Sequence, residues 1–147
     1  MKGSSEMRIT KTELASIGIF LVLCGVSAYF YPQMTEKMAC HWDIHGQVNG
    51  YMSKSVNMLI CPVILAVLII TLILIPRITS VSVNIEGFRR FYGGFVIFFS
   101  VFLLAIQYQM ILWNLGIEIN PLWVVLVVIF MTIDWIIIWY FAAHRQN

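Results

Sequence analysis

Charged side chains are scarce in this 147-residue sequence, where Asp, Glu, Lys and Arg together make up 11% of the residues. Soluble domains carry about 25% charged and about 45–50% apolar residues, whereas 61% of this chain is hydrophobic. The net charge is only +2, and no basic run is interleaved with aromatic residues, so nucleic acid is not an expected partner. The composition predicts an integral membrane protein whose main partner is the lipid bilayer.

Cysteine is also sparse, and three residues cannot build a disulfide framework. Cys24 and Cys61 stand in apolar runs, where cysteine behaves as a small buried residue. Cys40 stands in a polar stretch and could reach Cys61 if that stretch folded back. The sequence also lacks a Gly-x-Ser-x-Gly motif, a His-Glu-x-x-His motif and a phosphate-binding loop. We therefore expect a protein that is not an enzyme.

Long hydrophobic runs, by contrast, dominate the chain. A transmembrane helix needs about 17–25 residues, and a backbone in lipid has to satisfy its own hydrogen bonds. The fold class that we predict is all-α: an integral membrane protein with a single membrane domain over residues 1–147 and four transmembrane helices. The helices are expected at 14–31, 58–75, 95–113 and 122–141, with Gly93-Gly94 marking the entry to the third.

The distribution of Lys and Arg predicts the orientation of these helices. Seven of these residues lie in the two tails and the middle connection, and two lie in the first and third connections. Cytoplasmic segments carry the excess of positive charge, so both termini are expected in the cytoplasm and the loop 32–57 outside. Basic residues also precede the first run, and Val26-Ser27-Ala28 could be cleaved, so a signal peptide is an alternative to a retained first helix.

The outer loop 32–57 concentrates His41, Asp43 and His45 within five positions. Apolar and polar residues alternate from Cys40 to His45, which indicates an extended segment with the two histidines roughly 13 Å apart. A helical turn would instead place them at i and i+4, the spacing of helical zinc sites, with Gly46 ending the turn. A zinc site at His41, Asp43 and His45 is therefore an alternative, although catalytic zinc usually takes three protein ligands.

Thioethers in the same loop offer a second metal alternative. Met34, Met38 and Met52 could form a soft copper(I) site with Cys40. The other interpretation is packing, because Met34 and Met38 at i, i+4 fit a helical turn at the membrane interface. The pair Asn49-Gly50 is typical of a tight turn that needs positive φ, so the loop is expected to form an ordered cap. We predict no obligatory cofactor, with zinc and copper as the alternatives.

One ionisable residue lies inside the fourth apolar run. Asp134 at this depth is a functional hypothesis by default, because a charge in the bilayer is costly. Gln107 and Gln109 on the third helix are the best polar partners in the sequence. Gln107 and Asp134 would differ in depth by roughly 8 Å. A hydrogen-bonded Asp134 without a chemical role is the simpler interpretation.

Polar and aromatic residues stand at fixed spacing in the outer loop: His41, Trp42, Asp43, Gly46, Val48, Asn49, Gly50, Tyr51, Ser53 and Lys54. This pattern resembles the signature of a membrane family called domain of unknown function 1648 (DUF1648), although Asp43 and Asn49 depart from the usual Asn and Asp. The likeness extends over roughly residues 14–120, including 84–92. In that family the segment lies between the first two membrane helices, so the resemblance favours a retained first helix.

This domain forms the N-terminal half of the sporulation-delaying-protein immunity (SdpI-like) proteins, which protect a cell from its own secreted toxin. The resemblance implies a prokaryotic plasma membrane and a non-enzymatic role in immunity or sensing, in which the outer loop recognises an external peptide toxin or a stress signal. A homo-oligomer or a partner subunit could supply the second half that these proteins possess. The recognition surface would consist of His41, Trp42, Asp43, Gly46, Asn49, Tyr51 and Lys54.

The residues themselves leave two further functions as alternatives. The first is a small membrane transporter or metal-handling protein with His41, Asp43 and His45 at its mouth and Asp134 and Gln107 within. The second is a membrane hydrolase that uses Asp43 and the histidines as metal ligands, for which the sequence offers no identifiable general base.

Overall fold

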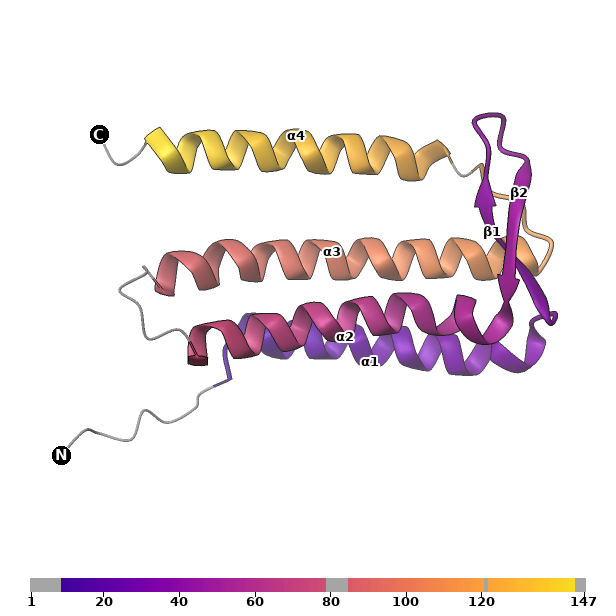
Figure 1. Cartoon of the computed structure of the whole chain (residues 1–147), viewed down its shortest axis with the longest axis horizontal. Coiled ribbons are helices and arrows are strands. Elements are labelled where there is room, and N and C mark those ends of the chain that lie inside the picture. The colour runs from indigo at the N-terminus through magenta and orange to yellow at the C-terminus, as the bar shows by residue number, and fades with distance from the viewer. Residues whose placement is uncertain (1–8, 79–84, 121, 145–147) are drawn as a thin grey trace.

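A computed structural model describes residues 9–78, 85–120 and 122–144 of the chain. Four α-helices run side by side along the molecule, and a two-stranded hairpin crosses one end of them (Figure 1). The hairpin lies between the first and second helices in the sequence. The elements are α1 (Lys11–Phe30), the short 3₁₀ helix η1 (Tyr31–Gln33), β1 (Lys37–Trp42), β2 (Val48–Ser53), α2 (Lys54–Ile78), α3 (Ile85–Asn114) and α4 (Leu122–His144).

Within the described residues, three stretches of helix are long and apolar enough to cross a membrane: Lys11–Gln33, Lys54–Leu74 and Tyr92–Asn114. In α4 the described apolar stretch, Leu122–Asp134, is shorter. The prediction of four helices is confirmed, and the molecule is a multi-pass helical membrane protein. A fourth crossing by α4 stays a prediction. The orientation also stays a prediction, and the tail residues 1–8 and 145–147 on which it partly depends lie outside the described residues.

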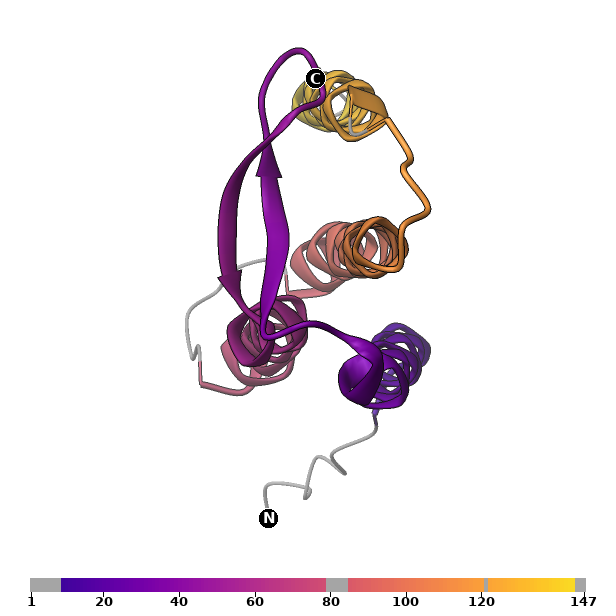
Figure 2. The same ribbon diagram turned by 90° about the vertical axis from the view of Figure 1, so that its right-hand side faces the viewer.

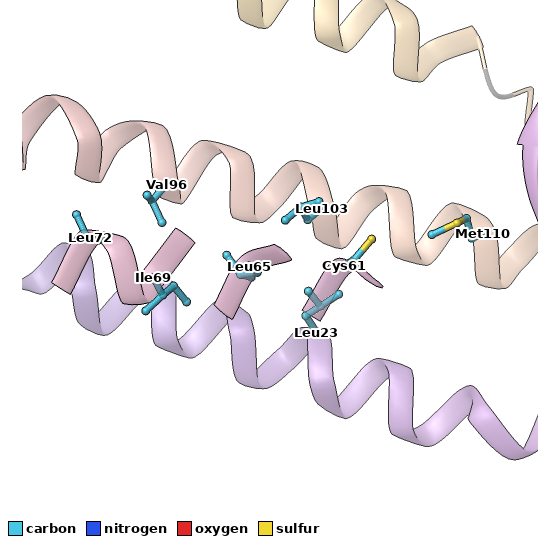
Figure 3. Packing of buried hydrophobic residues seen from close by; sticks show 8 residues of the cluster. All are labelled: Leu23, Cys61, Leu65, Ile69, Leu72, Val96, Leu103 and Met110. Carbon is cyan, nitrogen blue, oxygen red and sulfur yellow. The ribbon is translucent and has the colours of Figure 1, made fainter. Parts of the chain in front are cut away.

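Helices α1, α2 and α3 pack together as a three-helix bundle, seen end-on in Figure 2. Its core is a row of buried side chains that runs along the three helices, with Leu23, Leu65 and Leu103 near the middle (Figure 3). The outward faces carry exposed Leu, Val and Ile residues. Apolar side chains on the outside are expected where the surroundings are lipid rather than water.

Helix α4 runs antiparallel to α3, but it stands apart from the bundle in both views (Figures 1 and 2). No side chain in the described part of α4 is fully buried. Phe130 and Ile136, for example, are 66% and 62% exposed. The faces of α4 are therefore left to lipid or to another chain.

The predicted start of the third helix at Gly93-Gly94 is wrong, because α3 begins at Ile85 and continues through both glycines. Gly93 instead faces α1. A Cβ atom placed on Gly93 would lie 2.7 Å from Thr12 Cγ2, whereas one placed on Gly94 would meet no atom within 4 Å. Gly93 is thus a point of close helix–helix approach, a use that glycine shares with other small residues in membrane bundles.

Helices α1 and α2 also begin before the predicted positions, at Lys11 and Lys54. Thr10 and Glu13 form a capping box at α1, in which Thr10 Oγ1 accepts from the Glu13 N–H at 3.2 Å and Glu13 Oε2 accepts from the Thr10 N–H at 2.8 Å. Such caps satisfy amide groups that have no partner inside a helix. Polar residues beyond an apolar run can therefore extend a membrane helix.

Candidate functional site

The outer loop forms an antiparallel hairpin of β1 and β2. The extended conformation predicted from the alternation is confirmed for residues 40–42, and the helical-turn alternative is wrong. Of the apolar residues in this alternation, Cys40 and Trp42 pack against the bundle core. Ile44 does not, because β1 ends at Trp42 and Ile44 lies in the turn, where it is 79% exposed.

Asp43 and Gly46 build the turn of the hairpin. Asp43 Oδ1 accepts from the backbone N–H groups of His45 and Gln47, at 2.8 and 2.9 Å. Gly46 has a φ of 77°, in the left-handed region that favours glycine. Its N–H donates to the Asp43 carbonyl at 3.0 Å. These two members of the predicted recognition surface therefore shape the hairpin.

The tight turn predicted at Asn49-Gly50 is wrong, since both residues lie within β2. Gly50 pairs with His41 across the hairpin, and a Cβ on Gly50 would come within 2.8 Å of the His41 Cβ. The glycine is needed for close approach of the two strands. Beside it, His41 Nδ1 and Asn49 Oδ1 form a hydrogen bond. Since an amide oxygen can only accept, Nδ1 is the donor in this arrangement.

The outer face of the hairpin is formed by alternate residues of the two strands. Asn49, Tyr51 and Ser53 are exposed along β2, with His41 and Lys37 exposed along β1. Tyr51 is 64% exposed. We call His41, Asn49 and Tyr51 the outer triad. The triad combines an imidazole, an amide and a phenol on one surface, so it can donate and accept hydrogen bonds and also stack.

Asn114, the last residue of α3, holds the hairpin on the bundle. Its Oδ1 accepts from the Ala39 N–H at 2.8 Å, and its Nδ2 donates to the Ala39 carbonyl at 3.1 Å and to the Met110 carbonyl at 2.7 Å. Asn57 Nδ2, from the first turn of α2, also donates to the Ala39 carbonyl, at 3.4 Å. The side chain of Asn114 thus pairs with β1 much as a neighbouring strand would.

Aromatic contact supports this docking. The Trp42 ring lies edge-on to the Trp113 ring, with their centroids 5.3 Å apart and an angle of 73° between the planes. Such pairs contribute about 0.5–1.5 kcal/mol beyond the area that they bury. Trp42 was predicted on the recognition surface, but it packs inward instead. Trp113, Asn114 and Asn57 were not predicted as parts of the site. Nothing local in the sequence links Trp113 and Asn114 to a loop so far away in the chain, and Asn57, at the end of that loop, belongs to no motif.

Met34 and Met38 are buried in an apolar cluster with Met58 and Ile111. The predicted interfacial helical turn through Met34 and Met38 is wrong, because Met38 belongs to β1. Methionine fills irregular gaps well, which suits a junction between a strand and two helices. The pairing of Cys40 with Cys61 is also excluded in this structure, where all three cysteines are free.

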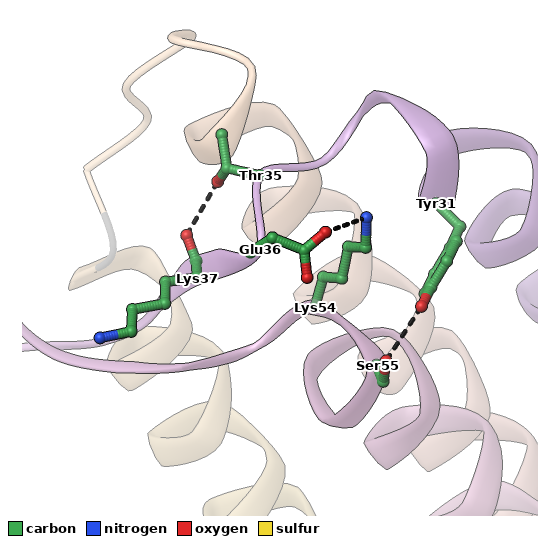
Figure 4. Close-up of polar contacts among 6 residues, drawn as sticks. All are labelled: Tyr31, Thr35, Glu36, Lys37, Lys54 and Ser55. Carbon is green, nitrogen blue, oxygen red and sulfur yellow. Dashed lines mark hydrogen bonds and ion pairs between the residues drawn. The ribbon is translucent and has the colours of Figure 1, made fainter.

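Lys54 lies at the start of α2 rather than on the outer face. Its Nζ pairs with Glu36 Oε1 at 2.7 Å and lies 5.1 Å from the centroid of the Tyr31 ring (Figure 4). Nearby, Tyr31 Oη and Ser55 Oγ form a hydrogen bond of 2.9 Å. Exposed ion pairs contribute little to stability, so these contacts mainly orient the chain where it leaves and re-enters the membrane.

The two remaining sets of predicted site residues are not assembled. Among the described residues, no group of three or more His, Cys, Asp or Glu side chains could hold a metal ion. His41, Asp43 and His45 are thus not gathered into one ligand set. Gln107 is fully buried in the bundle, where Nε2 donates to Met58 Sδ at 3.2 Å. Asp134 is exposed on α4, so the structure does not bring these two residues together.

A comparison with known protein families finds a match to the part of the chain that contains the hairpin. Residues 18–66, which run from α1 through the hairpin into α2, match the family model "Domain of unknown function (DUF1648)". Residues 18–66 are a DUF1648 domain. No curated protein and no solved structure matches the chain. The contacts of Trp113 and Asn114 therefore join the DUF1648 domain to a helix that lies beyond it in the sequence.

Proposed function

We propose that this DUF1648 protein is a non-enzymatic membrane protein of the immunity or sensing type, and that its hairpin recognises an external peptide toxin or stress signal. The observation that carries this proposal is the outer triad, an exposed polar and aromatic surface on a hairpin whose inner face is packed on the helix bundle. A surface fixed before binding loses less conformational freedom when a partner binds. Tyrosine is also enriched where proteins contact their partners.

The proposal assigns separate roles to the two faces of the hairpin. The inner face, with Cys40 and Trp42, packs on the bundle. The outer face is free to meet a peptide, provided that the hairpin lies outside the cell, as the excess of Lys and Arg at the other end of the helices predicts. A secreted peptide toxin is the first partner to test, on the expectation from the loop sequence that the chain resembles the immunity proteins. Four membrane crossings and two cytoplasmic termini complete the proposed topology.

Binding of a peptide toxin to the purified protein in lipid nanodiscs tests this function. The sporulation-delaying toxin is the probe. We expect the double variant His41→Ala/Tyr51→Ala to weaken binding by about 10- to 100-fold, or about 1.4–2.8 kcal/mol in total, because an interface residue that matters for binding costs about 1 kcal/mol or more when it is truncated.

The matched control is Ile44→Ala, which truncates a more exposed side chain of the same hairpin outside the outer triad. It should bind as the wild type does. Equal losses in both variants, or wild-type affinity in the double variant, would argue against recognition by the outer triad. Absence of binding by the wild type would remove this toxin as the ligand, and protection of cells against other secreted peptides would then be compared across the same three proteins.

A further inference from the structure

The free edge of β2 carries an inference that is separate from the outer triad. In the part of the chain that the structure describes, the sheet has two strands, so each strand pairs with the other along one edge. The edge of β1 that does not pair with β2 is occupied, because Asn114 and Asn57 bind the N–H and carbonyl groups of Ala39. In the end-on view, β2 lies on the side of β1 that faces away from α3 and α4 (Figure 2).

The register shows which backbone groups point out of this edge. Ala39 lies opposite Tyr51, and Lys37 lies opposite Ser53. In an antiparallel pair, opposed residues either exchange both hydrogen bonds or turn both groups away from each other. Ala39 directs its groups to Asn114, so the pair is of the second kind. The N–H and carbonyl groups of Tyr51 must then point away from β1, into the open edge. Ser53, two residues along, presents its N–H on the same side.

The edge of β2 also lacks the features by which proteins usually block strand pairing. Proline and lysine within an edge strand, or a charge that points inward, discourage a second strand. The sequence of β2 is Val-Asn-Gly-Tyr-Met-Ser, which contains none of these. The edge from Gly50 to Ser53 is regular, since the irregularities in pairing lie between Ala39 and Trp42 on the opposite strand.

The direction of the strands favours one particular occupant. Both strands run across the helix axes and lie side by side over the end of the bundle (Figures 1 and 2). Two copies of a membrane protein that share one orientation are related by a two-fold axis along the membrane normal. A strand that lies across this axis is antiparallel to its own copy. The geometry points to a homodimer in which β2 pairs with β2 of a second copy, giving a four-stranded antiparallel sheet on the outer surface.

Tyr51 lies at the centre of this pairing. Its N–H donates to the Tyr51 carbonyl of the second copy, and the reverse bond forms by symmetry, as in the reciprocal pair of an antiparallel ladder. The Cα atoms of the two Tyr51 residues are then about 5.5 Å apart. The outer triad remains exposed on the face of the enlarged sheet, so a dimer would present two such surfaces side by side.

Substitution by proline can block the open edge of β2 without removing a hydrogen bond between β1 and β2. Tyr51→Pro removes an N–H that β1 does not use, and proline is tolerated in an edge strand where its N–H side faces outward. We expect the wild type to dimerise in liposomes, measured by energy transfer between copies that carry donor and acceptor labels. Tyr51→Pro should weaken the dimer by about 10- to 100-fold through the loss of both central donors. Tyr51→Ala keeps the N–H and should dimerise as the wild type does.

Crosslinking gives a second measurement that does not depend on how proline is accommodated. Tyr51→Cys should form an interchain disulfide on mild oxidation, because a separation of about 5.5 Å suits the bond. Ile44→Cys is the control: it is more exposed, but the hairpin length places its two copies at least about 30 Å apart. A monomeric wild type, a dimer that survives Tyr51→Pro, or equal crosslinking at both positions would each overturn the proposal. Occupation of the edge only by an added peptide would overturn it too.

Discussion

Replacing Asn114 by alanine is expected to release the hairpin from the bundle and to lower the free energy of unfolding by about 2–4 kcal/mol. The Asn114 side chain makes hydrogen bonds to both backbone groups of Ala39 and to the carbonyl of Met110. Ala39 is only 4% exposed. Its N–H would lose its partner without gaining water, which costs about 1–3 kcal/mol for a buried polar group. Its carbonyl would keep only the 3.4 Å hydrogen bond from Asn57 Nδ2.

Hydrogen exchange of the backbone amides, measured by mass spectrometry in nanodiscs, reports on this release. Peptides that cover residues 37–53 should exchange faster in Asn114→Ala, whereas those from the middle of α2 should be unchanged. In Asn114→Asp, the hairpin peptides should exchange at a rate between those of the wild type and Asn114→Ala. This variant keeps the acceptor for the Ala39 N–H but loses the donor for the Ala39 carbonyl. The matched control is Glu118→Ala, an exposed residue of the same outer connection. Wild-type exchange in Asn114→Ala would mean that the hairpin is held by other contacts.

Replacing Gly93 by alanine is expected to lower the free energy of unfolding by about 1–3 kcal/mol, the usual cost of overpacking. The added Cβ would lie 2.7 Å from Thr12 Cγ2. Threonine is branched at Cβ and has few rotamers in a helix, so its methyl group cannot move aside freely. Helices α1 and α3 would have to separate instead. The loss should appear in thermal unfolding followed by circular dichroism in detergent micelles.

Two variants show whether this contact is the cause. Gly94→Ala places a methyl group where no atom lies within 4 Å, and it should be neutral or stabilising by up to about 1 kcal/mol, since alanine favours a helix over glycine. Thr12→Ser removes only the methyl group that alanine at position 93 would meet. It should restore most of the stability lost in Gly93→Ala when the two are combined. Similar losses in Gly93→Ala and Gly94→Ala would show that the approach of α1 and α3 is not limiting.

The sequence was sufficient to predict the helices, because long apolar runs have few other stable forms in lipid. Their ends were predicted less well. Lys54, Ser55 and Asn57 are polar, yet they open α2 because the helix begins directly after β2. Residues 85–94 likewise continue α3 beyond its most apolar part. Hydrophobicity reports where a helix meets lipid, and a helix can extend past that boundary.

The hairpin shows a different limit. Alternation from Cys40 to His45 predicted an extended segment, which is correct for residues 40–42. The turn was misplaced because Asn49-Gly50 is a strong local signal for a hairpin turn, whereas here Gly50 is required for contact with His41 across the sheet. The docking by Asn114 is beyond any local pattern, since Asn114 and Ala39 are 75 positions apart in the chain. Contacts of that kind depend on how the helices are arranged.

Exposure of the hairpin outside the cell is the condition for the proposed recognition, and side-specific labelling tests it most directly. Cysteine is introduced at Ile44, in the exposed turn, and separately at Lys11, an exposed residue at the opposite end of α1. A maleimide that cannot cross membranes is then applied to intact cells. We expect Ile44→Cys to react at once and Lys11→Cys to react only after permeabilisation, with a low background from the native cysteines. The reverse pattern would place the hairpin in the cytoplasm and contradict the proposed recognition of an external peptide.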